Sequence, residues 1–532
     1  MRSHIGTVRI EPTTHMLSKT YASALQGVDA KLITVETHTG NAIQSGGPVR
    51  HIVGLPDKAV SEGFMRINPA LRNQGFKPAR RVLTINLAPA SLRKEGSAYD
   101  LPIAVGILES TDQIAYASRK RYMLIGELAL DGKLRPVRGV LPMAIAAQQQ
   151  GFAGFIVPAA NADEASIVKD LEVYGAKDLR EVVDHLEGKR ELPRMAPRTT
   201  VREDLSRPFP LDFNDVMGQE NIKRSLEIAA AGGHNAILIG PPGAGKTMLA
   251  RRLPTILPPL SIDEALETTK IHSVAGKLPS GMGLVANRPF RAPHHTISDV
   301  ALVGGGANPM PGEISLAHNG VLFLDELPEF KRSVLEVMRQ PMEERRVTIS
   351  RARWTVDYPA SFMLLASMNP CPCGFYNHPT KECTCGGGKV KSYLNKISGP
   401  LLDRIDLHVE VVPVGYDELS REGRSGESSA EIAKRVVAAR GIQQQRFRQY
   451  NQIHCNAQMP SRLVRDTCPL DNAGRRMLET AMERLQLSAR AYDRILKVAR
   501  TIADLGNSKQ VGANHLAEAI QFRALDRGNW AG

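Results

Sequence analysis

Short apolar runs alternate with amphipathic stretches along most of the chain, and this alternation predicts an α/β protein. The first third carries strand patterns at 31–37, 81–87, 122–128 and 154–158, and helix patterns at 101–108 and 143–150. In the middle third, apolar runs predict buried strands at 235–239, 321–324 and 361–368, and helices are expected at 220–231 and 248–253. The last part is helical, with predicted helices at 431–448, 473–485, 492–505 and 514–524.

This organisation predicts several domains, because 532 residues exceed what one hydrophobic core supports. Residues 1–15 are polar and turn-rich, and we expect them to form a flexible extension. The domains expected after it are an α/β domain over 16–188, a linker rich in proline and arginine over 189–211, a second α/β domain over 212–414, and a helical lid and carboxyl-terminal domain over 415–532.

The segment between the predicted strand at 235–239 and the helix at 248–253 matches the phosphate-loop pattern G-x-x-x-x-G-K-[ST]. Its residues are Gly240, Pro241, Pro242, Gly243, Ala244, Gly245, Lys246 and Thr247. Glycines let such a loop curl so that backbone N–H groups point at phosphate oxygens, and the helix dipole adds to the attraction. We expect Lys246 to reach the β- and γ-phosphates of ATP and Thr247 to hold Mg²⁺. A chance glycine turn is the alternative interpretation.

Two further strand ends supply polar side chains suited to ATP hydrolysis. Asp325 and Glu326 end one apolar run, and Asn369 ends the next. Asp325 suits the Mg²⁺ shell, and Glu326 suits polarisation of the attacking water. The Asn369 side chain could lie between the γ-phosphate and that water, or serve only as a turn former. The set predicts an ATP hydrolase.

The composition favours a globular protein that binds a polyanion. The formal net charge is +13, which makes nucleic acid the first partner to consider, although charge alone is weak grounds. No apolar run approaches the roughly 20 residues of a membrane span. The first 15 residues also lack the apolar core of a signal peptide, so we expect no membrane association and a cytoplasmic location.

Four of the six cysteines form two close pairs, Cys371 with Cys373 and Cys383 with Cys385. Such pairs, separated by a glycine-containing loop, fit a tetrahedral structural Zn²⁺ in a reducing cytosol rather than a disulfide framework. The C-x-C spacing is tighter than the usual C-x₂-C, His378 could replace one sulfur, and free thiols or a redox pair are the alternatives. We expect this cysteine loop, 371–385, to brace a loop beside the ATP site.

Part of the first domain resembles the proteolytic domain of Lon proteases. The similar segments are 94–101, 125–128 and 132–140. In that register the nucleophilic serine falls on Ala98 and its lysine base on Leu141, while Ser97 lies one residue away. Because a nucleophile without an activating base is a weak catalyst, the resemblance implies a Lon-like (ribosomal-protein-like) α/β fold that is inactive as a protease.

The phosphate loop and the strand-end carboxylates resemble those of the AAA+ ATPases, whose sites form between subunits of a ring. The segment 399–406 is similar to the arginine-finger motif of replicative-helicase and magnesium-chelatase relatives. This similarity implies that Arg404 contacts the γ-phosphate held by a neighbouring subunit; a salt bridge with Asp403 or Asp406 is the alternative. It also implies a second phosphate-sensing arginine at the start of a lid helix, Arg490, with Arg494 one turn later as the alternative.

Two insertions in the second α/β domain carry basic residues that we expect at a DNA interface. The first contains Arg291 and His294 in a segment of loops or a hairpin. The second, 344–354, alternates as a basic hairpin and contains Arg345, Arg346, Arg351 and Arg353. In the ring helicases that this chain resembles, such hairpins line the pore and grip the nucleic-acid backbone, where arginine neutralises phosphates without reading sequence. A solvated hairpin or a subunit contact is the alternative.

Taken together, these features resemble the magnesium-chelatase-like AAA+ family of bacterial competence proteins, from about residue 16 to the end. The resemblance implies an ATP-driven homo-hexameric helicase that migrates single-stranded, forked or branched DNA during homologous recombination in natural transformation, alongside recombination proteins. Two alternatives remain. One is a magnesium-chelatase-type motor that remodels a protein partner, and the other is an ATP-dependent protease, against which Ala98 and Leu141 argue.

Overall fold

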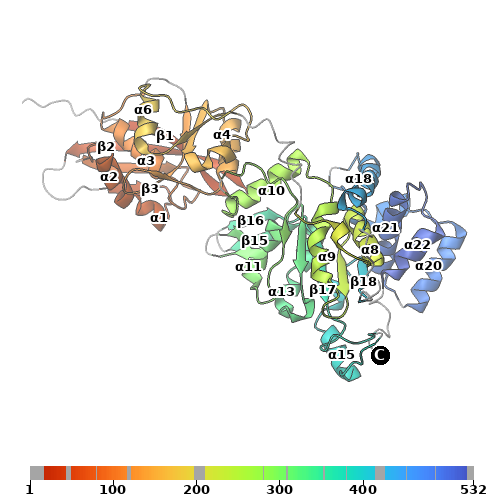
Figure 1. Cartoon of the computed structure of the whole chain (residues 1–532). Coiled ribbons are helices and arrows are strands. Elements are labelled where there is room, and N and C mark those ends of the chain that lie inside the picture. Colours follow the sequence, from red (N-terminus) through yellow and green to blue (C-terminus); the bar gives the residue numbers. More distant parts are fainter. Residues whose placement is uncertain are drawn as a thin grey trace, which may run out of the picture. The chain divides into compact units, whose positions relative to one another are not determined.

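A computed structural model of the chain describes residues 17–42, 50–79, 81–116, 121–196, 210–279, 281–306, 309–351, 354–378, 380–413, 426–450, 452–485 and 487–523. The chain forms two compact units (Figure 1). The first consists of Met1–Val201 with Thr269–Leu284, and the second of Arg202–Thr268 with Val285–Gly532. The extension expected at 1–15 lies outside the described residues, as does most of the expected linker.

The first unit is built on a mixed sheet with the strand order β3-β4-β2-β1-β5-β8-β9. Its strands are β1 (Leu17–Gln26), β2 (Asp29–Ala42), β3 (Arg50–Val53), β4 (Arg81–Ala88), β5 (Tyr122–Leu124), β8 (Gly154–Pro158) and β9 (Glu172–Ala176). The larger helices of this unit are α2 (Gly63–Asn73), α3 (Asp100–Ser110), α4 (Val140–Gln149) and α6 (Leu179–Leu186). The strands and helices expected from the hydrophobic pattern are present, the strand expected at 122–128 being split into β5 and β6 (Glu127–Leu128).

Helices cover both faces of this sheet. In β8, Ile156 belongs to the same hydrophobic cluster as α3, whereas Phe155 and Val157 belong to the cluster that contains α4. Because successive strand side chains point to opposite faces, α3 and α4 pack on opposite sides of the sheet.

Residues 269–284 also belong to this first unit, although they interrupt the sequence of the second. They include the end of α10 (Ile262–Val274). The carbonyl of Ser273 accepts a hydrogen bond from the Gly139 N–H at 3.2 Å, and the Ser273 hydroxyl donates to the buried Glu164 carboxylate. Nothing in the hydrophobic pattern indicated this placement, because it depends on a partner more than 100 residues away.

The second unit contains a parallel sheet with the order β11-β14-β17-β10-β18. Its strands are β10 (Ala236–Ile239), β11 (Phe290–Arg291), β14 (Val321–Leu324), β17 (Met363–Met368) and β18 (Leu407–Glu410). The three apolar runs predicted as buried strands are β10, β14 and β17, and every residue in them is buried. Helix α8 (Glu220–Gly232) packs beside β18, and α9 (Lys246–Arg252) beside β17.

The carboxyl-terminal part of this unit is helical, as the sequence predicted. Its helices are α18 (Ser429–Arg446), α19 (Ser461–Thr467), α20 (Asn472–Arg484), α21 (Ala489–Leu505) and α22 (Ala513–Gln521). Helices α18 and α21 contact α8, and a single hydrophobic cluster joins these helices to the strands β10 and β18. These carboxyl-terminal helices therefore share their core with the sheet.

For the two insertions, the structure differs from the sequence-based expectation at the first and agrees with it at the second. Phe290 and Arg291, expected in a loop or hairpin, instead form β11, which pairs in parallel with β14 at the sheet edge. The expected basic hairpin is present as β15 (Arg346–Arg351) and β16 (Trp354–Pro359), which pair antiparallel. Among the helices in the described part of the chain, none has the length and apolar character needed to cross a membrane.

Candidate functional site

Three neighbouring strands of the second sheet bring the predicted ATP-site residues to one edge. β17 lies between β10 and β14, and all three run parallel. β10 leads into the phosphate loop, β14 into Asp325 and Glu326, and β17 into Asn369. Because the carboxyl ends of parallel strands meet at the same edge, segments far apart in sequence become neighbours, which is the usual place for a nucleotide site.

The phosphate loop has the backbone geometry that its glycines permit. Gly243 and Gly245 lie in the left-handed region, with φ of 80° and 83°, and Gly245 forms the N-cap of α9. The Lys246 ammonium group is buried and donates to the carbonyls of Gly240 at 2.7 Å and Pro241 at 2.9 Å, and to Asn369 Oδ1 at 3.1 Å. Burial lowers the pKa of Lys246, and the carboxylates of Asp325 and Glu326 oppose this shift. The loop thus presents a cation and helix N–H groups, as phosphate binding requires.

The two residues expected to hold Mg²⁺ lie side by side. The Thr247 hydroxyl donates to Asp325 Oδ2 at 2.7 Å. The other oxygen of Asp325 accepts from the buried Ser367 hydroxyl and from the Glu326 N–H at 3.1 Å. A hydroxyl and a carboxylate so placed are the oxygen ligands that Mg²⁺ takes beside a nucleotide, so these side chains fit MgATP. Ser367 was not predicted; its signal is a single hydroxyl within an otherwise apolar strand.

Glu326 is held in a strained backbone conformation at the mouth of the site. Its φ is 53°, in the left-handed region that non-glycine residues rarely adopt, and its side chain is largely exposed. His295 Nδ1 lies 3.6 Å from Glu326 Oε2, and the His295 ring lies 4.1 Å from that of His294. The sequence drew attention to the histidine pair, but only His294 was chosen as a contact residue, and the partner of Glu326 was missed.

A cavity of about 450 Å³ opens beside Glu326 and Asn369. Its other walls come from Pro372 of the cysteine loop and from Lys389, Tyr393 and Lys396, on or just after α15 (Gly387–Leu394). Burial and the nearby carboxylates raise the pKa of Tyr393 to about 12, so this wall is neutral at the hydroxyl. The cavity therefore leaves one side of Glu326 and Asn369 open.

Arg404, the predicted arginine finger, is tied down within its own chain. Its side chain is 9% exposed and pairs with Glu343 Oε1 at 2.5 Å, and it donates to the Pro400 carbonyl at 2.6 Å. The partner is neither Asp403 nor Asp406, which were the alternatives from sequence. Contact with a neighbour's phosphate therefore requires release of the Glu343 pair.

The two candidate phosphate-sensing arginines, Arg490 and Arg494 on α21, have different surroundings. Arg494 forms an ion pair with the buried Asp406 carboxylate, which also accepts from His234. Burial alone would raise the pKa of Asp406, but Arg494 and His234 outweigh it and hold that pKa well below its usual range. Arg490 keeps a side chain that is 64% exposed and lies 3.8 Å from Asp403. The Arg490 side chain is thus more exposed than that of Arg494, and its role as a phosphate sensor stays a prediction.

The residues expected at a DNA interface have unequal freedom. Arg291 forms a two-bond pair with Glu313, at 2.6 and 2.8 Å, which occupies its guanidinium group. Arg345 is partly buried and donates to the Ser361 hydroxyl at 3.0 Å, and burial lowers its pKa. Arg346 is exposed and its Nε lies 3.5 Å from Glu344 Oε2, and His294 is also exposed. The Arg351 backbone ends β15, but its side chain, and all of Arg353, lie outside the described residues.

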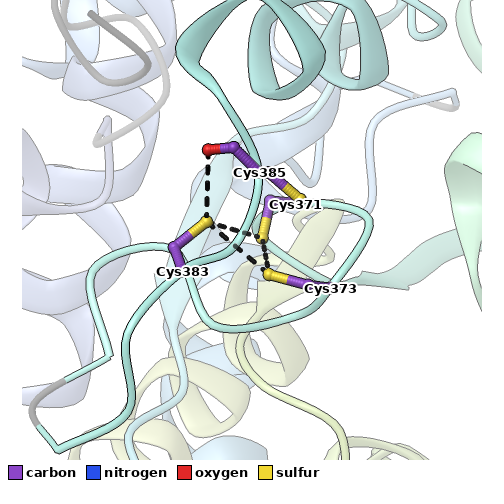
Figure 2. Close-up of side chains that lie close together, drawn as sticks. All are labelled: Cys371, Cys373, Cys383 and Cys385. Carbon is purple, nitrogen blue, oxygen red and sulfur yellow. Dashed lines mark hydrogen bonds between the residues drawn. The ribbon is translucent and has the colours of Figure 1, made fainter.

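The four clustered cysteines converge on one point. The Sγ atoms of Cys371, Cys373 and Cys383 are 3.3, 3.7 and 3.6 Å apart, and all four sulfurs lie within 4.8 Å of one another (Figure 2). Four thiolates around Zn²⁺ with bonds of about 2.3 Å need sulfurs about 3.8 Å apart, so the cluster fits the metal that the spacing suggested. His378 is not in the group; its Nδ1 accepts from the N–H groups of Thr380 and Lys381.

The residues at the Lon-like positions do not form a catalytic pair. Leu141 is fully buried at the start of α4, and its N–H donates to Glu164 Oε1 at 2.9 Å. The Ser97 hydroxyl donates to the Glu127 carboxylate. The Ala98 carbonyl accepts from the Gly126 N–H at 2.9 Å, which is an ordinary structural contact.

Three family models match separate parts of the chain. The family described as "Magnesium chelatase, subunit ChlI" matches residues 212–419, "Subunit ChlI of Mg-chelatase" matches 39–161, and "Magnesium chelatase, subunit ChlI C-terminal" matches 426–523. The first of these ranges contains the phosphate loop, the strand-end carboxylates and the cysteine loop.

Relatives of similar length support the same assignment. The chain is 45% identical over 515 residues to "Competence protein ComM" of Haemophilus influenzae, covering 96% of this chain and 98% of that protein. It is 45% identical over 511 residues to "Uncharacterized protein YifB" of Escherichia coli, with the same shares covered. A more distant similarity, 24% over 323 residues, covers 58% of this chain and 84% of "Holliday junction branch migration complex subunit RuvB" of Thermosipho melanesiensis. The identity over nearly the full length shows that the chain belongs to the magnesium-chelatase-like family that includes ComM and YifB.

Proposed function

We propose that this protein is an ATP-driven DNA motor, a helicase that assembles as a hexameric ring and migrates branched DNA during homologous recombination in natural transformation. The observation that carries the proposal is the array of Lys246, Thr247, Asp325, Glu326 and Asn369 at one sheet edge. This array stands in a chain closely related to a competence protein and more distantly to a branch-migration subunit.

In the proposed hydrolysis, each side chain has one task. Lys246 and the N–H groups at the start of α9 would hold the phosphates, and Thr247 and Asp325 would hold Mg²⁺, which would supply positive charge beside those phosphates. Glu326 orients and polarises the attacking water, with Asn369 on the side of the γ-phosphate. To do so, the Glu326 carboxylate, whose Oε2 lies 3.6 Å from His295 Nδ1, would turn from His295 toward the water.

DNA would be gripped through its backbone. The solvent face of the β15–β16 hairpin carries Arg346, Thr348 and Ser350, while Val347 and Ile349 face inward. A net charge of +13 favours approach to a polyanion. Contacts of this kind neutralise phosphates without reading bases, which suits a motor that moves along any sequence.

The test is branch migration of a synthetic Holliday junction by the full-length protein at low salt, where phosphate contacts are strongest. Lys246→Ala should prevent ATP binding, and Glu326→Gln should bind ATP without hydrolysing it; both should leave the junction intact. The proposal would be contradicted if none of single-stranded, forked or branched DNA stimulated ATP hydrolysis.

A second candidate is a motor that remodels a protein partner, and the magnesium-chelatase family match favours it. The two candidates predict different stimulants of the same ATPase. DNA should accelerate hydrolysis only in the first case. Replacement of Arg346, the exposed arginine of the hairpin, should reduce that acceleration only in the first case as well. A Lon-like first domain without protease activity belongs to both, and ATP-dependent cleavage of casein would contradict it.

A further inference from the structure

We propose that the cluster of Cys371, Cys373, Cys383 and Cys385 binds one Zn²⁺, and that the filled site holds the phosphate loop in shape, so that Zn²⁺ and ATP each strengthen the binding of the other. The inference rests on the ATP site of the proposed function. It does not depend on DNA being the substrate of the motor.

The cysteine loop touches the phosphate loop directly. Gly374, the residue after Cys373, has a φ of 84°, and a Cβ placed there would lie 2.5 Å from Cδ and 3.2 Å from Cγ of Pro242. The turn that ends at Gly374 is closed by a hydrogen bond from its N–H to the Cys371 carbonyl at 3.0 Å. The backbone at Gly374, between the proposed ligands Cys373 and Cys383, therefore packs against the ring of Pro242 so closely that even a Cβ atom would not fit between them.

The same loop is attached to the phosphate loop from a second side. Asn369, two residues before Cys371, accepts a hydrogen bond from the Lys246 ammonium group at 3.1 Å. Pro372, between the first two cysteines, lines the cavity beside Glu326. Movement of the Cys371–Gly374 turn would therefore be transmitted both to Pro242 and to the partner of Lys246.

Without a metal, this turn has weak means of keeping its shape. Thiols are poor hydrogen-bond donors and acceptors, and Cys373, Cys383 and Cys385 are only partly buried. A Zn²⁺ ion would cross-link the turn to residues ten or more positions later, and such binding contributes directly to local folding. Metal binding by the cysteines would therefore restrict the motion of Pro242.

Coupling of this kind is reciprocal. If Zn²⁺ raises the affinity for ATP by some factor, ATP must raise the affinity for Zn²⁺ by the same factor, which for two coupled sites is typically about 5- to 150-fold. This equality separates a brace on the phosphate loop from general stabilisation of the fold, which would not respond to nucleotide.

The first experiment measures metal content. Elemental analysis of the full-length protein should give one Zn²⁺ per chain, and Cys383→Ser with Cys385→Ser should abolish it. Cys468→Ala, which removes a buried thiol outside the loop, is the matched control and should keep the metal. Wild-type protein without zinc, or with its four thiols oxidised in pairs, overturns the metal site.

The second experiment measures the dissociation constant of the fluorescent nucleotide mant-ATP, without any DNA. Removal of Zn²⁺ from wild-type protein with a chelator should raise that constant by at least about fivefold, and added Zn²⁺ should restore it. Competition with the chelator should show the matching rise in Zn²⁺ affinity when ATP is present. Unchanged nucleotide binding in zinc-free, still folded protein overturns the brace while leaving the ATP site and the motor untouched.

Pro242→Ala locates the coupling. If the contact with Gly374 carries it, loss of zinc should weaken nucleotide binding less in Pro242→Ala than in wild type, as a double-mutant cycle reports. Equal losses in both backgrounds would overturn the role assigned to this contact.

Discussion

Arg404 is the residue whose expected role and observed position differ most, and its replacement gives a sharp prediction. In Arg404→Ala, ATP hydrolysis should fall by about 10³-fold or more, because an arginine finger of this kind stabilises charge in the transition state. Nucleotide binding should change little, since the substitution leaves Lys246 and Thr247, the residues we propose for nucleotide and Mg²⁺ contacts, in place. A 10³-fold loss corresponds to about 4 kcal/mol in the barrier.

The structural contribution of Arg404 is much smaller, so the two effects can be told apart. Its pair with Glu343 has one buried and one largely exposed partner, at 9% and 55% exposure, so the pair itself is worth at most about 1 kcal/mol. Glu343→Gln removes this pair and leaves the arginine. If the finger role is right, that variant should hydrolyse ATP at the wild-type rate or up to about fivefold faster, since the arginine is released from about 1 kcal/mol of restraint.

A mixing assay tests whether Arg404 acts on a neighbour. Arg404→Ala and Lys246→Ala should each be inactive alone. In mixed rings, some interfaces combine an intact phosphate loop from the first variant with an intact finger from the second; with equal amounts this is about one quarter of the interfaces of a cyclic ring. Recovery of about that fraction of wild-type turnover is expected. No recovery on mixing, or equal losses in Arg404→Ala and Glu343→Gln, would refute the reasoning.

Three further predictions follow from other contacts. His295→Ala should raise DNA-independent ATP hydrolysis, by no more than about fivefold because the pair with Glu326 is partly exposed, and an unchanged ratio of basal to DNA-stimulated rates would count against it. Arg346→Ala should lower the slope of log affinity for DNA against log salt by about 1, whereas the exposed Arg475→Ala on α20 should not. Asp406→Asn should lower the free energy of unfolding by up to about 3 kcal/mol at pH 7, because the partly buried Arg494 loses its charged partner. Since the pKa of Asp406 lies below its usual range, urea titrations should show that difference persisting down to about pH 4 and shrinking as the pH falls further.

The sequence predicted which residues lie together at the phosphate loop, because each part of this arrangement is a local sequence pattern. An apolar run followed by a glycine turn with Lys246 and Thr247, or by paired carboxylates, specifies a strand and what stands at its end. Parallel strands then bring those ends together without further information. The hairpin of β15 and β16 was equally local, since alternation over a few residues fixes both pairing and face.

The partners of these residues were not accessible in the same way. Glu343 meets Arg404, and His295 meets Glu326, only because of how the chain crosses the sheet, and nothing in their immediate sequence signals it. Residues 269–284 are similar: their place in the first unit depends on Ser273 meeting Glu164. Such contacts decide whether the side chain of a predicted catalytic group is free to reach a substrate or is held by another residue. The motif alone does not predict which of the two holds.

The end of β17 links these separate observations. Ser367 near its end holds Asp325, Asn369 just beyond it accepts from Lys246, and Cys371 two residues later begins the cysteine loop. β17 lies between β10, which leads into the phosphate loop, and β14, which leads into the carboxylates. A shift of its carboxyl end would therefore disturb the phosphate loop and the carboxylates together. The zinc site that we propose directly after this strand would therefore act at the point from which Asp325, Asn369 and Lys246 are positioned, although its cysteines take no part in the proposed hydrolysis.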